Sequence, residues 1–269
     1  MSHFALAVIS DGTKTLEDLM APYQENNTDD VPRKYLEFVS EDIGPYEANY
    51  NEGIHSMYYD PDANPMQLLT AYDERFRVKG FRGSYGTNTH SVPDNWRRVD
   101  IPINLLYPTF DDYMRECEGY RDGKDPETNQ YGYWENPNAK WDWYTVGGRW
   151  KKWADDTIGG CAVRVGEIRF NPELEREKAM RWYEHADKES LEFHLVSKGL
   201  SMEEYAELCS NLYFRACITP DGEWHEVGEM GWWGISSETK EEVKEWAASF
   251  AGRFLNNPDH VITVVDCHI

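Results

Sequence analysis

Apolar and polar positions form their clearest pattern at the two ends of the chain. Residues 3–10 (HFALAVIS) are an apolar run with β-branched members, and Asp11-Gly12 ends it. Residues 260–269 (HVITVVDCHI) form a second run of this kind. Short apolar runs bounded by turn residues are typical of buried strands. We therefore expect both terminal segments to be strands that lie side by side in one sheet, with His3 and His268 close together.

Segments between the two ends have the spacing and the capping residues of helices. Thr15 and Thr109 are candidate N-caps, and Ser201 with Glu204 matches a capping box, which satisfies backbone N–H groups that a first helical turn leaves free. Asp221-Gly222 separates two strand-like runs and predicts a hairpin. The expected helices cover residues 15–27, 64–77, 109–123, 171–200, 201–212 and 236–257, and residues 160–170 are expected to form a strand.

These elements predict an α+β fold in one domain, residues 1–269. Its sheet is mostly antiparallel and includes both terminal strands, with helices packed on it and long aromatic-rich loops. Residues 25–100 combine Asn and Pro with many tyrosines, and we interpret them as a loop-rich elaboration. Within this segment, residues 80–100 are the most loop-like stretch.

Charge narrows the range of partners. Lys and Arg number 27 against 49 Asp and Glu, a formal net charge of -22. Such a chain repels nucleic-acid backbones and anionic membranes, so we expect neither as a direct partner. A protein with a basic or DNA-binding surface is a more plausible partner. The simplest interpretation of the charge remains solubility.

Five cysteines, at positions 117, 161, 209, 217 and 267, include no CxxC pair. This pattern favours a reduced, cytoplasmic protein without disulfides. No histidine spacing matches a known metal motif, so no metal and no cofactor are expected. No stretch approaches the length of a membrane-spanning helix.

The segment NPNAKWDWYTVGGRW, residues 136–150, is the strongest candidate for a ligand site. Trp141 and Trp143 share one face if the segment is a strand, and Asp142 then points the other way. Gly147-Gly148 permits a close approach to backbone, and the planar guanidinium of Arg149 suits phosphate or carboxylate. Aromatic planes beside this arginine suit a nucleotide. The alternative is that the tryptophans are core and that Arg149 pairs with Asp142. The candidate ligand-binding residues are Trp141, Trp143, Gly147, Gly148, Arg149, Trp150, Trp232 and Trp233.

Proton-transfer candidates lie in this segment and in two other clusters. Glu229 lies between glycines just before Trp232-Trp233, where an apolar setting would raise its pKa. A solvated turn is the alternative. Asp266 and His268 are two residues apart, so a strand places them on one face, where a carboxylate can orient an imidazole. Cys267 then faces the other side as part of the core. The weak catalytic candidates are Asp142, Glu229, Asp266 and His268.

Several of these motifs, in order along nearly the whole chain, resemble a family of uncharacterised proteins of tailed bacteriophages and prophages. The resemblance rests on SHFALAVI, LMAPYQEN, NPNAKWDWYTVGGRW, GEMGWWG and TVVDCHI. It implies a phage origin and action in the cytoplasm of an infected bacterium. No activity is established for the family, so it assigns no catalytic residue.

Two functional hypotheses follow, one of binding and one of catalysis. The first is a binding protein that counters a host defence or takeover target, by acidic mimicry on a protein surface or by capture of a nucleotide-like molecule. The second is a small enzyme that acts on a nucleotide or a nucleotide-derived metabolite. A structural, virion-associated role is a third alternative.

Overall fold

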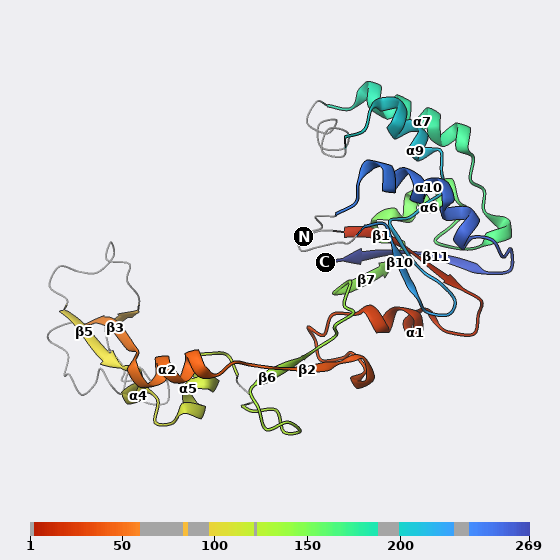
Figure 1. Cartoon of the computed structure of the whole chain (residues 1–269). Coiled ribbons are helices and arrows are strands. Elements are labelled where there is room, and N and C mark those ends of the chain that lie inside the picture. The colour runs from red at the N-terminus through yellow and green to blue at the C-terminus, as the bar shows by residue number, and fades with distance from the viewer. Residues whose placement is uncertain (1–2, 60–82, 86–96, 121–122, 188–198, 229–236) are drawn as a thin grey trace. The chain divides into compact units, whose positions relative to one another are not determined.

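The computed structural model describes residues 3–59, 83–85, 97–120, 123–187, 199–228 and 237–269 (Figure 1). The chain forms two compact units. Unit 1 comprises Met1–Glu37 and Glu135–Ile269, and unit 2 is the intervening segment Phe38–Trp134. Unit 2 thus contains most of the predicted elaboration, residues 38–100, and continues to residue 134. The single-domain organisation stays a prediction.

Unit 1 is built on a six-stranded sheet that includes both terminal strands. β1 (His3–Ser10) and β11 (Val261–His268) are antiparallel neighbours, and His3 is paired with His268. The sheet order is β10-β9-β1-β11-β7, and β8 also pairs with β11. Only the β1–β9 pair is parallel among these ladders. The predicted α+β fold, with a mostly antiparallel sheet and paired termini, is therefore confirmed. The remaining strands are β7 (Trp143–Val146), β8 (Ala162–Arg164), β9 (Ala216–Ile218) and β10 (Trp224–Glu226).

Helices cover both faces of this sheet (Figure 1). On one face, which we call the α1 face, α1 (Leu16–Met20) packs on Phe4, Leu6 and Val8. On the other, the α10 face, α10 (Lys240–Phe254) packs with α6 (Lys151–Thr157) on Ala5, Ala7 and Ile9, because side chains alternate along β1. α7 (Pro172–His185) and α9 (Met202–Cys209) form a further layer beside α10.

Capping residues begin the helices where the sequence predicts them. Thr15 and Ser201 form capping boxes at α1 and α9, and Thr109 caps α5 (Phe110–Glu116). The last long helix begins after Thr239, whose side chain accepts the N–H of Glu242, so it starts later than predicted. The Asp221-Gly222 hairpin joins β9 and β10 as predicted.

Two predicted boundaries are wrong for local reasons. Of the strand predicted at residues 160–170, only Ala162–Arg164 pairs with β11. Gly160, two residues before this strand, has a φ of 148°. After the strand the backbone turns into a 3-10 helix at Val165–Glu167. α7 ends at His185 rather than continuing, while residues 188–198 lie outside the described residues.

Unit 2 has a core of its own, rich in tyrosine. A three-stranded sheet runs in the order β4-β3-β5, so the stretch at residues 80–100 contains strands that the sequence analysis missed. Tyr113 lies at the centre of the core, where burial and a hydrogen bond to Glu118 raise its pKa to about 12. The helix predicted at residues 64–77 lies outside the described residues. The elements are β2 (Glu37–Ser40), α2 (Gly44–Glu52), β3 (Ile54–Tyr59), β4 (Gly83–Tyr85), β5 (Arg97–Pro102), α4 (Ile103–Leu106), α5 and β6 (Gly132–Glu135), with β2 and β6 forming a two-stranded sheet.

Candidate functional site

The tryptophan-rich segment divides its two central tryptophans between the two faces of the sheet. Trp141 lies on the α1 face and is only 3% exposed, whereas Trp143 is 46% exposed and stacks on His268 on the α10 face. The prediction that they share a face is wrong, because the strand begins only at Trp143 and Trp141 forms an isolated bridge with Gln24. Core packing and site geometry therefore both occur within this one segment.

Asn136 shows why the segment begins as it does. Its buried side-chain amide donates hydrogen bonds to the carbonyl oxygens of Pro22 (2.8 Å) and Gln24 (2.9 Å) and accepts one from the N–H of Asn138 (3.0 Å). A buried amide with these bonds is satisfied. This end of the motif is thus explained by folding alone.

Two buried histidine–aspartate pairs lie at the edge of the α10 face. His3 Nδ1 is 2.9 Å from Asp266 Oδ1, and His268 Nδ1 is 2.7 Å from Asp142 Oδ1. The side chains of His3 and His268 are each 7% exposed and that of Asp266 is 3% exposed. The Arg149–Asp142 pair of the alternative interpretation is not formed, and Asp142 binds His268 instead. Pairing of β1 with β11 creates this arrangement from residues at opposite ends of the chain.

The glycine pair brings backbone against one of these carboxylates. Gly148 has a φ of 42°, and a Cβ atom there would lie 2.4 Å from Asp266 Oδ2. The N–H of Arg149 donates to the same oxygen at 2.9 Å. Gly147 also has a positive φ, 74°, and approaches Cys161. The glycines thus allow backbone to reach Asp266, while the side chain of Arg149 is exposed to solvent.

Aromatic contacts bind the two pairs into one group, which we call the histidine–aspartate cluster: His3, Asp142, Trp143, Asp266 and His268. The rings of His3 and His268 meet edge to face at 4.9 Å between centroids. Trp143 stacks on His268 at 4.9 Å and meets His3 edge to face at 5.4 Å. His268 Nε2 is buried and has no hydrogen-bond partner among the described residues.

This geometry determines what the cluster can do chemically. The carboxylate of Asp142 accepts a hydrogen bond from the Nδ1–H of His268 and so fixes the tautomer in which Nε2 carries a lone pair. Such a nitrogen can accept a hydrogen bond from a hydroxyl group or act as a general base. Cys267 is not a nucleophile here, since it faces the α1 face and burial raises the pKa of its thiol.

A cavity of about 410 Å³ lies on the same face of the sheet. Trp150 lines it, so one of the predicted ligand-binding residues does border a cavity. Its other walls are mostly aromatic side chains of α6, α7 and α9 and of the segment before β9. The sequence analysis missed these, because their contribution depends on how the helices pack.

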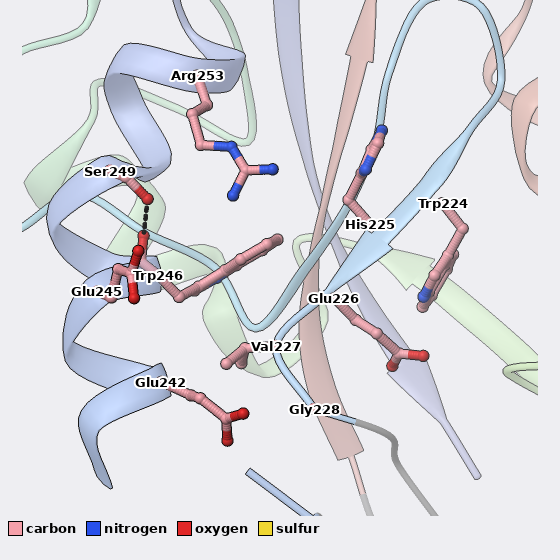
Figure 2. Close-up of a pocket in the computed structure, with 10 residues that line it drawn as sticks. All are labelled: Trp224, His225, Glu226, Val227, Gly228, Glu242, Glu245, Trp246, Ser249 and Arg253. Carbon is pink, nitrogen blue, oxygen red and sulfur yellow. Dashed lines mark hydrogen bonds between the residues drawn. The ribbon is translucent and has the colours of Figure 1, made fainter. Parts of the chain in front are cut away.

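A second, open groove of about 550 Å³ lies between α10 and β10 (Figure 2). Arg253 lies over the ring of Trp246 at 5.6 Å, and Glu226 pairs with Lys140 at 2.8 Å. The groove ends at Gly228, beyond which Glu229, Trp232 and Trp233 lie outside the described residues. Their predicted roles therefore stay predictions.

Other comparisons add little to this picture. Within the described residues, no group of three or more His, Cys, Asp and Glu side chains could hold a metal ion. No helix in this part of the chain is long and apolar enough to cross a membrane. No protein-family model, curated protein or solved structure matches the chain.

Proposed function

We propose that this chain is a bacteriophage accessory protein that binds a nucleotide-like small molecule at the histidine–aspartate cluster and thereby counters a host defence or takeover process. The phage origin rests on the sequence resemblance. The binding site rests on one observation, the buried and unpaired Nε2 of His268 beside the half-exposed ring of Trp143.

The unpaired nitrogen favours a ligand with a hydroxyl group. A buried polar atom without a partner costs about 1–3 kcal/mol, and a ligand hydroxyl that donates to Nε2 would remove this cost. Asp142 holds the imidazole in place at 2.7 Å, so the imidazole loses little conformational entropy when a ligand binds. Ribose hydroxyls have this chemistry.

Two neighbouring groups support the same class of ligand. Trp143 offers its exposed surface for stacking, and flat rings stack well on indole. The guanidinium of Arg149 is exposed and has no ion pair among the described residues, while the backbone N–H of the same residue binds Asp266. It is available for a phosphate group.

The test is titration calorimetry with the four common ribonucleosides and their four 5′-monophosphates. His268→Asn is the informative variant, because the asparagine amide can still donate to Asp142 but has no atom at the position of Nε2. We expect it to weaken binding about tenfold. His185→Asn is the matched control, since His185 is an exposed histidine on α7. Equal affinity in wild type and His268→Asn would disprove a ligand at Nε2.

Catalysis is the second candidate function, and the same atom favours it. A histidine whose Nδ1 is held by a carboxylate can take a proton from water or from a substrate hydroxyl. Mass spectrometry of each nucleotide after incubation with the protein distinguishes the two. Conversion that stops in His268→Asn supports an enzyme, whereas unchanged ligand that stays bound supports capture.

The charge of -22 supports a different binding mode, in which an acidic surface occupies a basic host protein. Screening weakens contacts between exposed charges as salt rises. Pull-down from bacterial lysate at about 0.05 M and 0.5 M salt tests this mode. A host protein retained equally at both concentrations argues against charge mimicry.

A further inference from the structure

The aromatic cavity on the α10 face has the size and walls of a small-molecule site. Its volume of about 410 Å³ falls within the usual range for such sites, about 300–1,000 Å³. Indole and phenyl rings form most of its surface, among them Trp150, Trp153, Trp182 and Phe214. Walls of this kind select flat, apolar-faced ligands.

Backbone connects this cavity directly to the histidine–aspartate cluster. Ala5, which lines the cavity, is the register partner of Asp266 across the β1–β11 ladder. Trp150 follows Arg149, whose N–H binds Asp266. His3 lies two residues from Ala5 on the same face, a separation of about 7 Å along a strand. The two places are therefore neighbours on one face of the sheet.

The polar groups of the cavity disfavour a charged occupant. Glu175 and Lys178 both line it, and they pair with each other at 2.6 Å. Cys209 and Tyr205 stay neutral near pH 7, because burial raises the pKa of each. An aromatic cage for a cation would present an unpaired carboxylate instead.

Trp150 supplies a directional feature of the cavity. Its indole N–H is buried and has no acceptor among the described residues. The same holds for Trp141 on the α1 face, so an unpaired indole N–H alone indicates nothing. Trp150 differs because it lines a cavity, where a ligand can bring the missing acceptor.

We infer that the cavity takes the heteroaromatic base of a nucleoside-class ligand, with a ring nitrogen or carbonyl of the base accepting the indole N–H of Trp150. The remainder of the ligand then lies at the histidine–aspartate cluster, and this second part alone rests on the proposed function. The occupied cavity would distinguish nucleosides by their bases.

The test uses probes that contain only a ring. Benzimidazole and indole have the same shape, but only benzimidazole has a ring nitrogen that accepts a hydrogen bond. We expect wild-type protein to bind benzimidazole about tenfold more tightly than indole by calorimetry. Trp150→Phe should bring the two affinities within about twofold of each other, because it keeps an aromatic wall and removes the donor.

Trp153→Phe is the matched control, since it removes an indole from the same cavity wall and leaves Trp150 in place. It should keep the preference for benzimidazole. If Trp150→Phe does not fold, Ala179→Leu replaces it, because this substitution on α7 reduces the cavity and should abolish binding of both probes.

His268→Asn separates this inference from the proposed function. It should leave benzimidazole binding unchanged and weaken binding of complete nucleosides. The cavity assignment is overturned if benzimidazole does not bind to wild-type protein. It is also overturned if wild type and Trp150→Phe prefer benzimidazole over indole to the same extent. Both conclusions hold even if His268→Asn still weakens the binding of nucleosides. If benzimidazole binds as expected but His268→Asn does not change the affinity for nucleosides, the cavity assignment is supported and the proposed function is overturned.

Discussion

The two faces of the unit 1 sheet are made by the same strands but are packed differently. On the α1 face, β1 presents Phe4, Leu6 and Val8, which meet α1 and Trp141 in a closed core. On the α10 face, the same strand presents His3, Ala5, Ala7 and Ile9, and aromatic side chains of α10 pack over them. Large apolar side chains stabilise the sheet on both faces, but at the His3 end of the α10 face small and polar side chains lie beside a cavity.

This difference shows how one strand can serve stability and binding together. Alternate side chains point to opposite faces, so substitutions on one face leave the other intact. Trp141 and Trp143, two residues apart in one motif, have separate surroundings because the strand begins only at Trp143. We therefore expect Trp141 to contribute mainly to stability and Trp143 mainly to ligand binding.

The largest expected effect is the loss of Trp141. Trp141→Ala would leave a void among Phe4, Leu6 and Val265 in the closed core. Truncation of a buried tryptophan typically lowers the free energy of unfolding by about 3–5 kcal/mol. Urea unfolding followed by circular dichroism measures this loss. A decrease below about 1 kcal/mol would show that Trp141 is not tightly packed in this core.

Gly148→Ala tests the backbone approach on the α10 face. Its Cβ would lie 2.4 Å from Asp266 Oδ2, and its φ of 42° disfavours any side chain. Left-handed strain and loss of the Arg149 N–H bond to Asp266 together predict a decrease of about 2–4 kcal/mol in unfolding free energy. Gly252→Ala is the control, because Gly252 lies in α10 with open space around it, and it should be neutral or slightly stabilising. Equal effects of the two would contradict the close approach.

The sequence predicts some features of these two faces and misses others. The terminal strands, the capped helices and the Asp266–His268 spacing follow from local patterns, so they were predictable. His3 could be placed near His268 only by expecting the two ends to pair. The partnership of Asp142 with His268 was missed, because it depends on the chain leaving strand geometry before Trp143. The cavity depends on how α6, α7 and α9 pack on the sheet, which no local pattern encodes.

Trp143→Ala sharpens the contrast within the tryptophan motif. Trp143 is 46% exposed, so its truncation removes less buried surface than that of Trp141 and should lower the unfolding free energy by about 1–2 kcal/mol. Binding of nucleosides should fall more than tenfold, because the stacking surface beside His268 is lost. Calorimetry and urea unfolding of one preparation measure both quantities. A variant that loses stability as Trp141→Ala does, but keeps its ligand, would reverse the roles of the two faces.

The smallest expected effect concerns how α9 and α10, which lie over the α10 face, are linked. Glu204 on α9 contacts Lys240 and Lys244 on α10, each at 2.7 Å, and these hydrogen bonds lower the pKa of its carboxyl to about 2. The carboxyl is solvent-accessible, so screening keeps its contribution small. Because the pKa is lower in the folded state, the contribution is present above the ordinary pKa of 4.5 and is lost as pH falls toward 2. Glu204→Gln should therefore lower the urea midpoint at pH 7 and have less effect as the pH falls below 4.5. Glu203→Gln is the control, because Glu203 is exposed on the same helix, and the difference of its midpoint from that of wild type should not shrink as the pH falls. A constant difference across this range would mean that the ionised carboxyl of Glu204 does not link the two helices.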